Sequence, residues 1–201
     1  MSGVAIIDYG VGNLRSVEKA FHAAGIAAIV SSNESELQRA ERLVLPGVGA
    51  FRSCMTEITA RGFDGLVAER VAEGIPLLGV CVGMQVLFQS SDEFGYTAGL
   101  GLLKGTVRRF TGELHVPHVG WNQVETANQS GLMNSVPNDA FFYFVHSYFC
   151  VADDEGDVIG WTNYGVKYAS VVGRGKISGV QFHPEKSQAN GLTLLRNFGT
   201  S

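Results

Sequence analysis

The chain has 201 residues, of which 45% are hydrophobic and 17% charged, so we expect one globular domain spanning residues 1–201. The net charge is −4 and no dense run of Lys or Arg occurs, which gives no indication of nucleic acid as a partner. The N-terminus lacks the basic and apolar regions of a signal peptide, and no apolar run reaches ~18 residues, so we expect no membrane span. The three cysteines, Cys54, Cys81 and Cys150, form neither a disulfide framework nor a zinc-type pair, which favours a reducing compartment, the cytoplasm.

The first half of the chain alternates short apolar runs with helical patterns. After a glycine-rich turn, Leu14, Val17, Phe21 and Ala24 recur at helical spacing. Strands are expected at 4–7, 27–30, 43–45 and 76–80, and helices over 14–24, over 51–73 with an interruption at 61–65, and from Met84 onward. This alternation predicts a parallel sheet with helices on both faces.

The second half of the chain reads mainly as strands separated by Gly, Asn and Asp turns. The expected strands are 106–110, 119–124, 141–145, 158–161, 168–172 and 177–182, and a last helix covers 191–198. We therefore predict an open, mixed α/β sheet with helices on both faces and added antiparallel strands.

The strongest local motif is Gly79-Val80-Cys81-Val82-Gly83, between a predicted strand and a predicted helix. It matches the G-x-nucleophile-x-G pattern of a nucleophile elbow, in which glycines relieve the crowding of a sharp turn. The thiol of Cys81 then stands at a helix N-terminus, which favours a thiolate, and the N–H of Val82 is a candidate oxyanion donor. The alternative is a buried structural cysteine between two packing glycines.

The second motif is His183-Pro184-Glu185, at the end of the strand that begins at Ile177. Residues two apart in an extended segment face the same side, so Glu185 can orient the imidazole of His183. His183 can then exchange a proton with Cys81. An isolated H-P-E would be an ordinary surface turn, but both motifs follow predicted strands, where open α/β sheets place their sites.

The third motif, Pro46-Gly47-Val48-Gly49, also follows a predicted strand. Glycine makes unusual backbone angles accessible, so a second oxyanion N–H from Val48 or Gly49 could turn toward or away from the site. The simpler interpretation is a strand-to-helix turn.

Together, P-G-V-G, G-V-C-V-G-M-Q and Q-F-H-P-E-K in this order resemble the class I (triad) glutamine amidotransferases, with their flavodoxin-like fold. The similarity extends over residues 4–198. The stretches P-H-V-G-W-N (117–122) and F-V-H-S-Y (144–148) are similar to the glutaminase subunits of that family whose partner is a separate (β/α)8-barrel cyclase. Val82 and Val119 stand where other apolar residues are common.

The resemblance implies that Cys81, His183 and Glu185 form a catalytic triad that releases ammonia from L-glutamine for the cyclase. It also implies substrate contacts from Gln85, His146, Ser147 and Tyr148. By the same resemblance, the partner would be contacted by Asn13, Trp121, Tyr143 and Lys186. No cofactor is implied.

Several other interpretations remain open at this stage. Taken alone, Gln85 could be a solvated helix position, and His115 and His118 are read as structural histidines, so no metal is assigned. The run Gly10-Val11-Gly12 fails the dinucleotide fingerprint because Arg15 occupies the third glycine position. Three alternative functions remain. They are a stand-alone cysteine hydrolase, a catalytically inactive flavodoxin-like binding module, and a glutaminase for an anthranilate or pyridoxal phosphate synthase.

Overall fold

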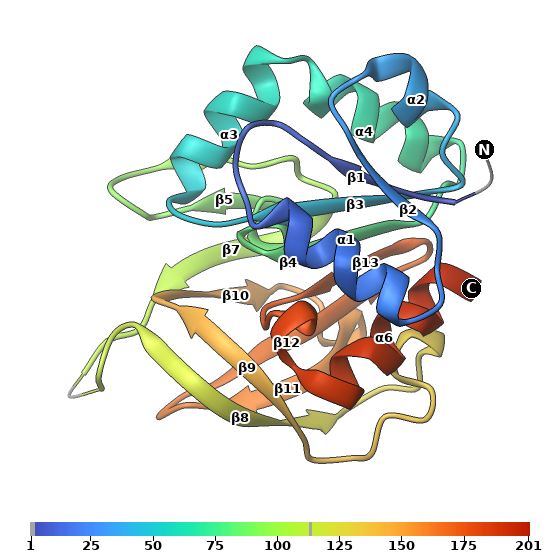
Figure 1. Ribbon diagram of the computed structural model, residues 1–201. Helices are drawn as coiled ribbons and strands as arrows, with labels where there is room; N and C mark the ends of the chain where they lie inside the picture. Colours follow the sequence, from blue (N-terminus) through green and yellow to red (C-terminus); the bar gives the residue numbers. More distant parts are fainter. Residues whose placement is uncertain (1–2, 113) are drawn as a thin grey trace.

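The protein is built around one strongly twisted sheet, and the computed structural model describes residues 3–112 and 114–201 (Figure 1). Five parallel strands lie side by side in the order β2 (Ala28–Ser31), β1 (Val4–Ile7), β3 (Arg42–Gly47), β4 (Leu77–Cys81) and β13 (Ile177–Val180). β1 and β4 are buried along their whole length. Such unbroken apolar strands are typical of a parallel sheet that is covered on both faces.

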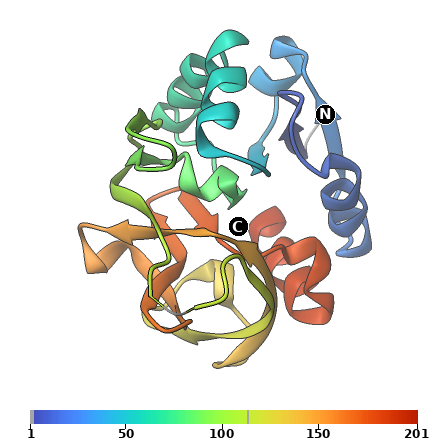
Figure 2. The same cartoon turned by 90° about the vertical axis from the view of Figure 1, so that its left-hand side faces the viewer.

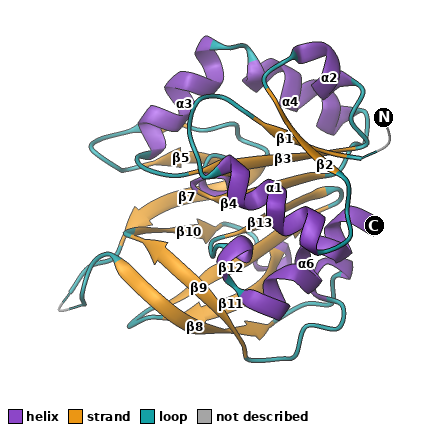
Figure 3. Ribbon diagram, viewed as in Figure 1, coloured by secondary structure: helices purple, strands orange, loops and turns teal. Residues whose placement is uncertain are grey.

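Helices cover both faces of this parallel part (Figure 3). α1 (Leu14–Ala23) and α6 (Gln188–Thr200) lie on one face, and α2 (Glu34–Gln38), α3 (Phe51–Ala60) and α4 (Phe63–Ala72) lie on the other. α1 buries Val17, Ala20 and Phe21, the apolar stripe that its spacing predicts. The predicted interruption between α3 and α4 falls at Gly62, whose φ of 72° only glycine adopts without strain.

Beyond β13 the sheet continues mainly with antiparallel strands, as the change in pattern predicts. The order is β12 (Lys167–Arg174), β10 (Tyr148–Ala152), β7 (Leu103–Arg109), β5 (Phe88–Ser91) and β6 (Thr97–Ala98), with β5 and β7 parallel. From β12 the sheet also continues through β11 (Val158–Asn163) and β8 (His118–Thr126) to β9 (Ala140–His146), which curl below the parallel part (Figure 2). Three short 3-10 turns complete the secondary structure described: η1 (Gly131–Met133), η2 (Glu155–Asp157) and η3 (Pro184–Lys186).

The fold class predicted from the sequence is confirmed, with differences in detail. The helix expected from Met84 begins earlier, at Val82, and is the single turn α5 (Val82–Gln85). The elements α2, β5, β6 and β10 were not predicted. The carboxyl ends of the parallel strands β3, β4 and β13 lie on the same side of the molecule, which faces the viewer in Figure 2. The three sequence motifs follow these strand ends, so the fold gathers them at one place.

Candidate active site

Cys81 is the last residue of β4 and has a backbone conformation that is unusual for a residue with a side chain. Its φ is 57° and its ψ is −116°. A strained conformation of this kind costs about 1–3 kcal/mol and persists only where the surrounding structure enforces it. The chain therefore turns sharply at Cys81 and enters α5, as a nucleophile elbow requires.

The glycines around Cys81 are what make this turn possible. A Cβ on Gly83 would stand 1.8 Å from the carbonyl oxygen of Leu45 on β3, and a Cβ on Gly79 would stand 2.6 Å from the carbonyl oxygen of Gly83. A Cβ on Gly47 would likewise stand 2.6 Å from the nitrogen of Gly83. The elbow is thus packed backbone against backbone on β3, and the surrounding structure holds the strain at Cys81.

His183 and Glu185 form a buried ion pair at the end of β13. The Nδ1 of His183 lies 2.8 Å from Oε1 of Glu185, and the two side chains are 9% and 2% exposed. The backbone also holds His183, because its N–H donates to the carbonyl of Tyr143 and its carbonyl accepts from the hydroxyl of Ser187. With Nδ1 engaged, Nε2 is the ring nitrogen that remains for a second partner.

The protonation of His183 is set by competing effects. Burial lowers the pKa of its imidazole, but hydrogen bonding and the negative charges of Cys81 and Glu185 outweigh burial and raise that pKa to about 10. An imidazole with this pKa carries its proton at neutral pH. His183 is therefore in its acid form when the site is at rest.

Cys81 and His183 meet because β4 and β13 are neighbours in parallel register, with Val80 opposite Val180. Both side chains line one cavity of about 380 Å3. The sulfur of Cys81 also lies 3.9 Å from the carbonyl oxygen of Val145 and 3.8 Å from Nε2 of Gln181. Cys81 and His183, distant in sequence, thus border one cavity, and Glu185 is joined to the site through its contact with Nδ1 of His183.

The predicted substrate residues line the same cavity. Nε2 of Gln85 donates to the carbonyl of Tyr148 at 3.0 Å, and Ser147 and Tyr148 form part of the wall. His146 also borders the cavity, but its Nδ1 donates to the same Tyr148 carbonyl at 2.8 Å. Its Nε2 lies 3.1 Å from the hydroxyl of Tyr168, so both ring nitrogens have partners within the protein.

Burial makes His146 a neutral group. It lowers the pKa of His146 to about 3, and burial likewise lowers the pKa of its neighbour His118 to about 4. The two rings are hydrogen-bonded, with Nδ1 of His118 3.2 Å from Nε2 of His146. His118 is thus a buried residue that supports His146 in the cavity wall, in line with its interpretation from the sequence as a structural histidine.

The predicted oxyanion residues Val48, Gly49 and Val82 also line the cavity. Val82 begins α5 directly after Cys81, so its N–H belongs to the first turn of that helix. Gly49 has a φ of 83°, in the region that glycine favours, and Val48 is 38% exposed. The loop thus stands at the mouth of the cavity beside the elbow.

Two residues of the site were not singled out in the sequence. Gln181 is fully buried under Cys81, and its Oε1 accepts from Nε2 of Gln85 at 3.0 Å. Gln181 is two residues before His183, so the alternation of a strand could have revealed that it lies on the same side of the chain as His183. Glu93 lines the cavity with a carboxylate that accepts from the N–H of Phe51 at 2.6 Å. No local pattern around Glu93 indicates this position.

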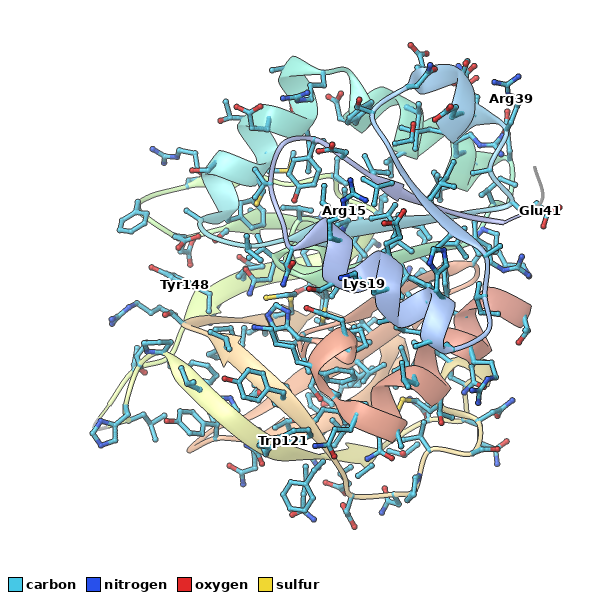
Figure 4. All side chains as sticks on the ribbon, in the orientation of Figure 1. Arg15, Lys19, Arg39, Glu41, Trp121 and Tyr148 are labelled. Carbon is cyan, nitrogen blue, oxygen red and sulfur yellow. The ribbon has the colours of Figure 1, made fainter. Side chains whose placement is uncertain are left out.

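The residues expected to face a partner lie together on the outside of the site. Trp121 is 45% exposed on β8, directly opposite Tyr143 on β9, and Nζ of Lys186 lies 5.6 Å from the centre of the Tyr143 ring. Asn13 is exposed before α1, which packs against the turn that carries Lys186. In Figure 4, Trp121 lies along β8, while Arg15 marks α1 above it.

Within residues 3–112 and 114–201, no cluster of three or more His, Cys, Asp or Glu side chains is arranged to hold a metal ion. In the same part of the chain, no helix is both long enough and apolar enough to cross a bilayer.

Comparison with known proteins identifies the family. The profile described as "Glutamine amidotransferase class-I" matches residues 5–200, and the chain therefore belongs to the class-I glutamine amidotransferase family. The chain is 50% identical to "Imidazole glycerol phosphate synthase subunit HisH" of Salinibacter ruber, with 96% of this chain and 92% of that protein covered. It is 46% identical to the subunit of the same name from Moorella thermoacetica, with 99% and 95% covered. These relatives confirm the assignment to the glutaminase subunits that the sequence motifs indicated.

Solved structures show the same fold at lower identity. A crystal structure of a glutamine amidotransferase superposes with a TM-score of 0.76 at 23% identity and covers 98% of this chain and 97% of that one. The structure of PurLQS from Thermotoga maritima gives a TM-score of 0.76 at 18% identity, with 97% and 96% covered. At this identity the likeness concerns the fold alone.

Proposed function

We propose that this chain hydrolyses L-glutamine to glutamate and ammonia and passes the ammonia to a separate cyclase subunit in histidine biosynthesis. One observation carries the proposal most directly. The strained Cys81 and the buried His183–Glu185 ion pair sit at the ends of adjacent parallel strands, and Cys81 and His183 border one cavity. This is the arrangement needed for nucleophilic attack on a carboxamide followed by protonation of the leaving nitrogen.

The first half of the reaction forms a thioester. The thiolate of Cys81 attacks the side-chain carboxamide carbon of glutamine, and the carbonyl oxygen becomes an oxyanion. The N–H of Val82 and an N–H of Val48 or Gly49 stabilise that oxyanion. As the C–N bond breaks, Nε2 of His183 gives its proton to the nitrogen, and ammonia leaves. The pKa of about 10 suits His183 for this step because the ring holds a proton at neutral pH.

The second half releases glutamate. Once it has lost its proton, His183 accepts one from a water molecule that attacks the glutamyl thioester carbon. The carbon–sulfur bond then breaks, glutamate forms, and Cys81 leaves as a thiolate beside the reprotonated ring. Glu185 stabilises the imidazolium at each stage through the 2.8 Å contact.

The far end of the cavity suits the amino-acid end of glutamine. Glu93 places a buried carboxylate in the wall, which complements the α-ammonium group of the substrate. Gln85, Ser147 and Tyr148 contribute polar groups beside it. His146 acts mainly through the Tyr148 carbonyl that it holds, because both of its ring nitrogens are already engaged.

The proposed partner is a (β/α)8-barrel cyclase that forms a heterodimer with this chain. It adds the ammonia to a phosphoribulosyl-formimino aminoimidazole carboxamide nucleotide and yields imidazole glycerol phosphate and an aminoimidazole carboxamide nucleotide. The exposed pair Trp121 and Tyr143, with Lys186 and Asn13, supports a docking surface near the cavity. We further propose that residues 1–201 act as one domain in the cytoplasm, where three free, buried thiols are compatible with a reducing environment.

The test is a glutaminase assay of the purified chain, alone and with the cyclase subunit and its nucleotide substrate. We expect turnover to rise when the partner binds nucleotide, and the double variant Cys81→Ala/His183→Ala to lose it. Cys150→Ala removes another buried thiol, one that does not line the cavity, and should remain active. Full activity of the double variant, or equal turnover with and without the partner, would refute the proposal. Stimulation by an anthranilate synthase subunit instead would favour that alternative.

A further inference from the structure

The loop Pro46–Gly49 includes the last two residues of β3, leads toward α3 and carries the two candidate oxyanion donors, Val48 and Gly49. Three peptide groups make up this loop: Pro46–Gly47, Gly47–Val48 and Val48–Gly49. In a trans peptide the C=O and N–H point in opposite directions, so fixing one fixes the other. The orientation of each donor therefore depends on what holds the carbonyl of its own peptide group.

Tyr9 holds the first peptide group. Its hydroxyl donates to the carbonyl of Pro46 at 2.5 Å, and the side chain is fully buried. The same hydroxyl lies 3.0 Å from where a Cβ of Gly47 would stand, so it packs directly against the turn. Burial raises the pKa of Tyr9, so the phenol stays protonated and remains a hydrogen-bond donor.

Cys54 holds the third peptide group. Its thiol lies in the first turn of α3 and donates to the carbonyl of Val48 at 3.4 Å, and the side chain is fully buried. Burial raises the pKa of Cys54 as well, which keeps the sulfur a thiol that can donate. Neither Tyr9 nor Cys54 takes part in the chemistry proposed for Cys81.

From these two contacts we infer that Tyr9 and Cys54 are positioning residues that clamp the loop on both sides of the Gly47–Val48 peptide group. Between the two clamps, Gly47 pairs with Cys81 at the end of β3, so the peptide group that carries the N–H of Val48 lies beside the elbow. The inference rests on the proposed glutaminase function and deepens it, because it assigns two further residues to the positioning of the oxyanion donors.

The two contacts act on the orientation of both candidate donors. The N–H of Gly49 belongs to the peptide group whose carbonyl Cys54 holds, so it points away from the sulfur and stays fixed. The N–H of Val48 belongs to the peptide group between the two clamps, so rotation of either neighbouring peptide group would displace it.

The experiment compares Tyr9→Phe, Cys54→Ala and Cys54→Ser in the complex with the cyclase subunit and its nucleotide. Losing a clamp lets a flanking peptide rotate, so we expect kcat for glutamine hydrolysis to fall about tenfold, the effect of one lost hydrogen bond in the transition state. KM should stay within about twofold because the glutamine contacts lie elsewhere. Cys54→Ser retains a donor to the Val48 carbonyl and should restore most of kcat.

Two controls remove matched groups away from the loop. Cys150→Ala deletes another buried thiol, and Tyr164→Phe deletes a phenol hydroxyl that donates to the carbonyl of His115. Both should retain wild-type kcat. An unchanged kcat in Tyr9→Phe and Cys54→Ala would overturn the clamp, as would an equal loss in Cys54→Ala and Cys54→Ser, or in Cys54→Ala and Cys150→Ala. An inactive wild-type complex would instead refute the proposed function, so the two failures are distinguishable.

Discussion

Trp121 and Tyr143 lie directly opposite each other on β8 and β9, with their ring centroids 5.9 Å apart in an edge-on arrangement. This places the half-exposed indole beside a ring that also lies under the ammonium group of Lys186. Partly exposed aromatic pairs of this kind are typical anchors of protein interfaces. In the proposed heterodimer, this pair is the surface at which we expect the cyclase to dock.

Trp121→Ala should therefore weaken binding of the cyclase without unfolding the chain. An anchor of about 2 kcal/mol or more corresponds to a rise in Kd of roughly 30-fold or more. Calorimetric titration with the purified cyclase measures this Kd directly. Tyr96→Ala, which removes a 74% exposed aromatic ring from another loop, is the matched control and should leave Kd unchanged. Equal effects of the two variants would contradict the assignment of the surface.

The pair His183–Glu185 predicts how activity depends on pH. His183 acts as an acid, so activity is present below its pKa and is lost as pH rises through about 10. Glu185→Gln removes a negative charge that raises this pKa, so the alkaline limb should move to lower pH. We expect kcat at pH 8 to fall by about 10²–10⁴. A profile of kcat from pH 6 to 10.5 checks this, and an alkaline limb that does not move would contradict the role of Glu185.

The parallel half of the fold was predictable because each element has a strong local signal. The apolar runs of β1, β3 and β4 and the helical spacing of Val17 and Phe21 leave few alternative arrangements. Weak signals explain what was missed. α2 has only five residues, too few for a periodic pattern, and β10 follows β9 after the single residue Ser147, so the two strands read as one region.

The site was predictable where chemistry and sequence spacing coincide. Cys81 sits in a glycine-flanked turn, and His183 and Glu185 are two residues apart, so the local sequence alone predicts how these side chains are placed. Glu93 could not be found this way. It reaches the cavity through the tertiary contact of its carboxylate with the first N–H of α3, which lies 42 residues earlier in the chain. The catalytic and binding roles of these residues remain predictions.

The buried His118–His146 pair predicts a loss of stability in mild acid. Burial lowers both pKa values, to about 4 and about 3, whereas unfolded histidines titrate near 6.5. Below pH 6.5 the unfolded chain takes up protons that the folded chain does not, so stability falls as pH falls. From pH 7 to 5 each ring should cost about 1–2 kcal/mol of unfolding free energy.

The variant His118→Phe separates this effect from other titrations. It keeps an aromatic ring against Phe144 and removes one of the two titrating groups, so the loss between pH 7 and pH 5 should be smaller by about 1–2 kcal/mol. His183 acts in the opposite direction, because its raised pKa contributes stability that is lost between pH 6.5 and about 10. Urea unfolding at pH 5 and 7 measures the difference, and identical pH dependence in both proteins would contradict the assignment.

The packing of Gly83 on Leu45 predicts a strong effect of one added methyl group. A Cβ at position 83 would overlap the carbonyl oxygen of Leu45, and backbone atoms on both sides cannot move apart without separating β3 from the elbow. Gly83→Ala should lower the unfolding free energy by roughly 3 kcal/mol or more and abolish glutaminase activity.

Gly65→Ala is the matched control, because a Cβ there meets nothing within 4 Å in α4. Alanine in an open helical position should raise stability by about 0.5–1 kcal/mol. Urea unfolding of both variants tests the pair, and a Gly83→Ala protein as stable as Gly65→Ala would show that the elbow can relax.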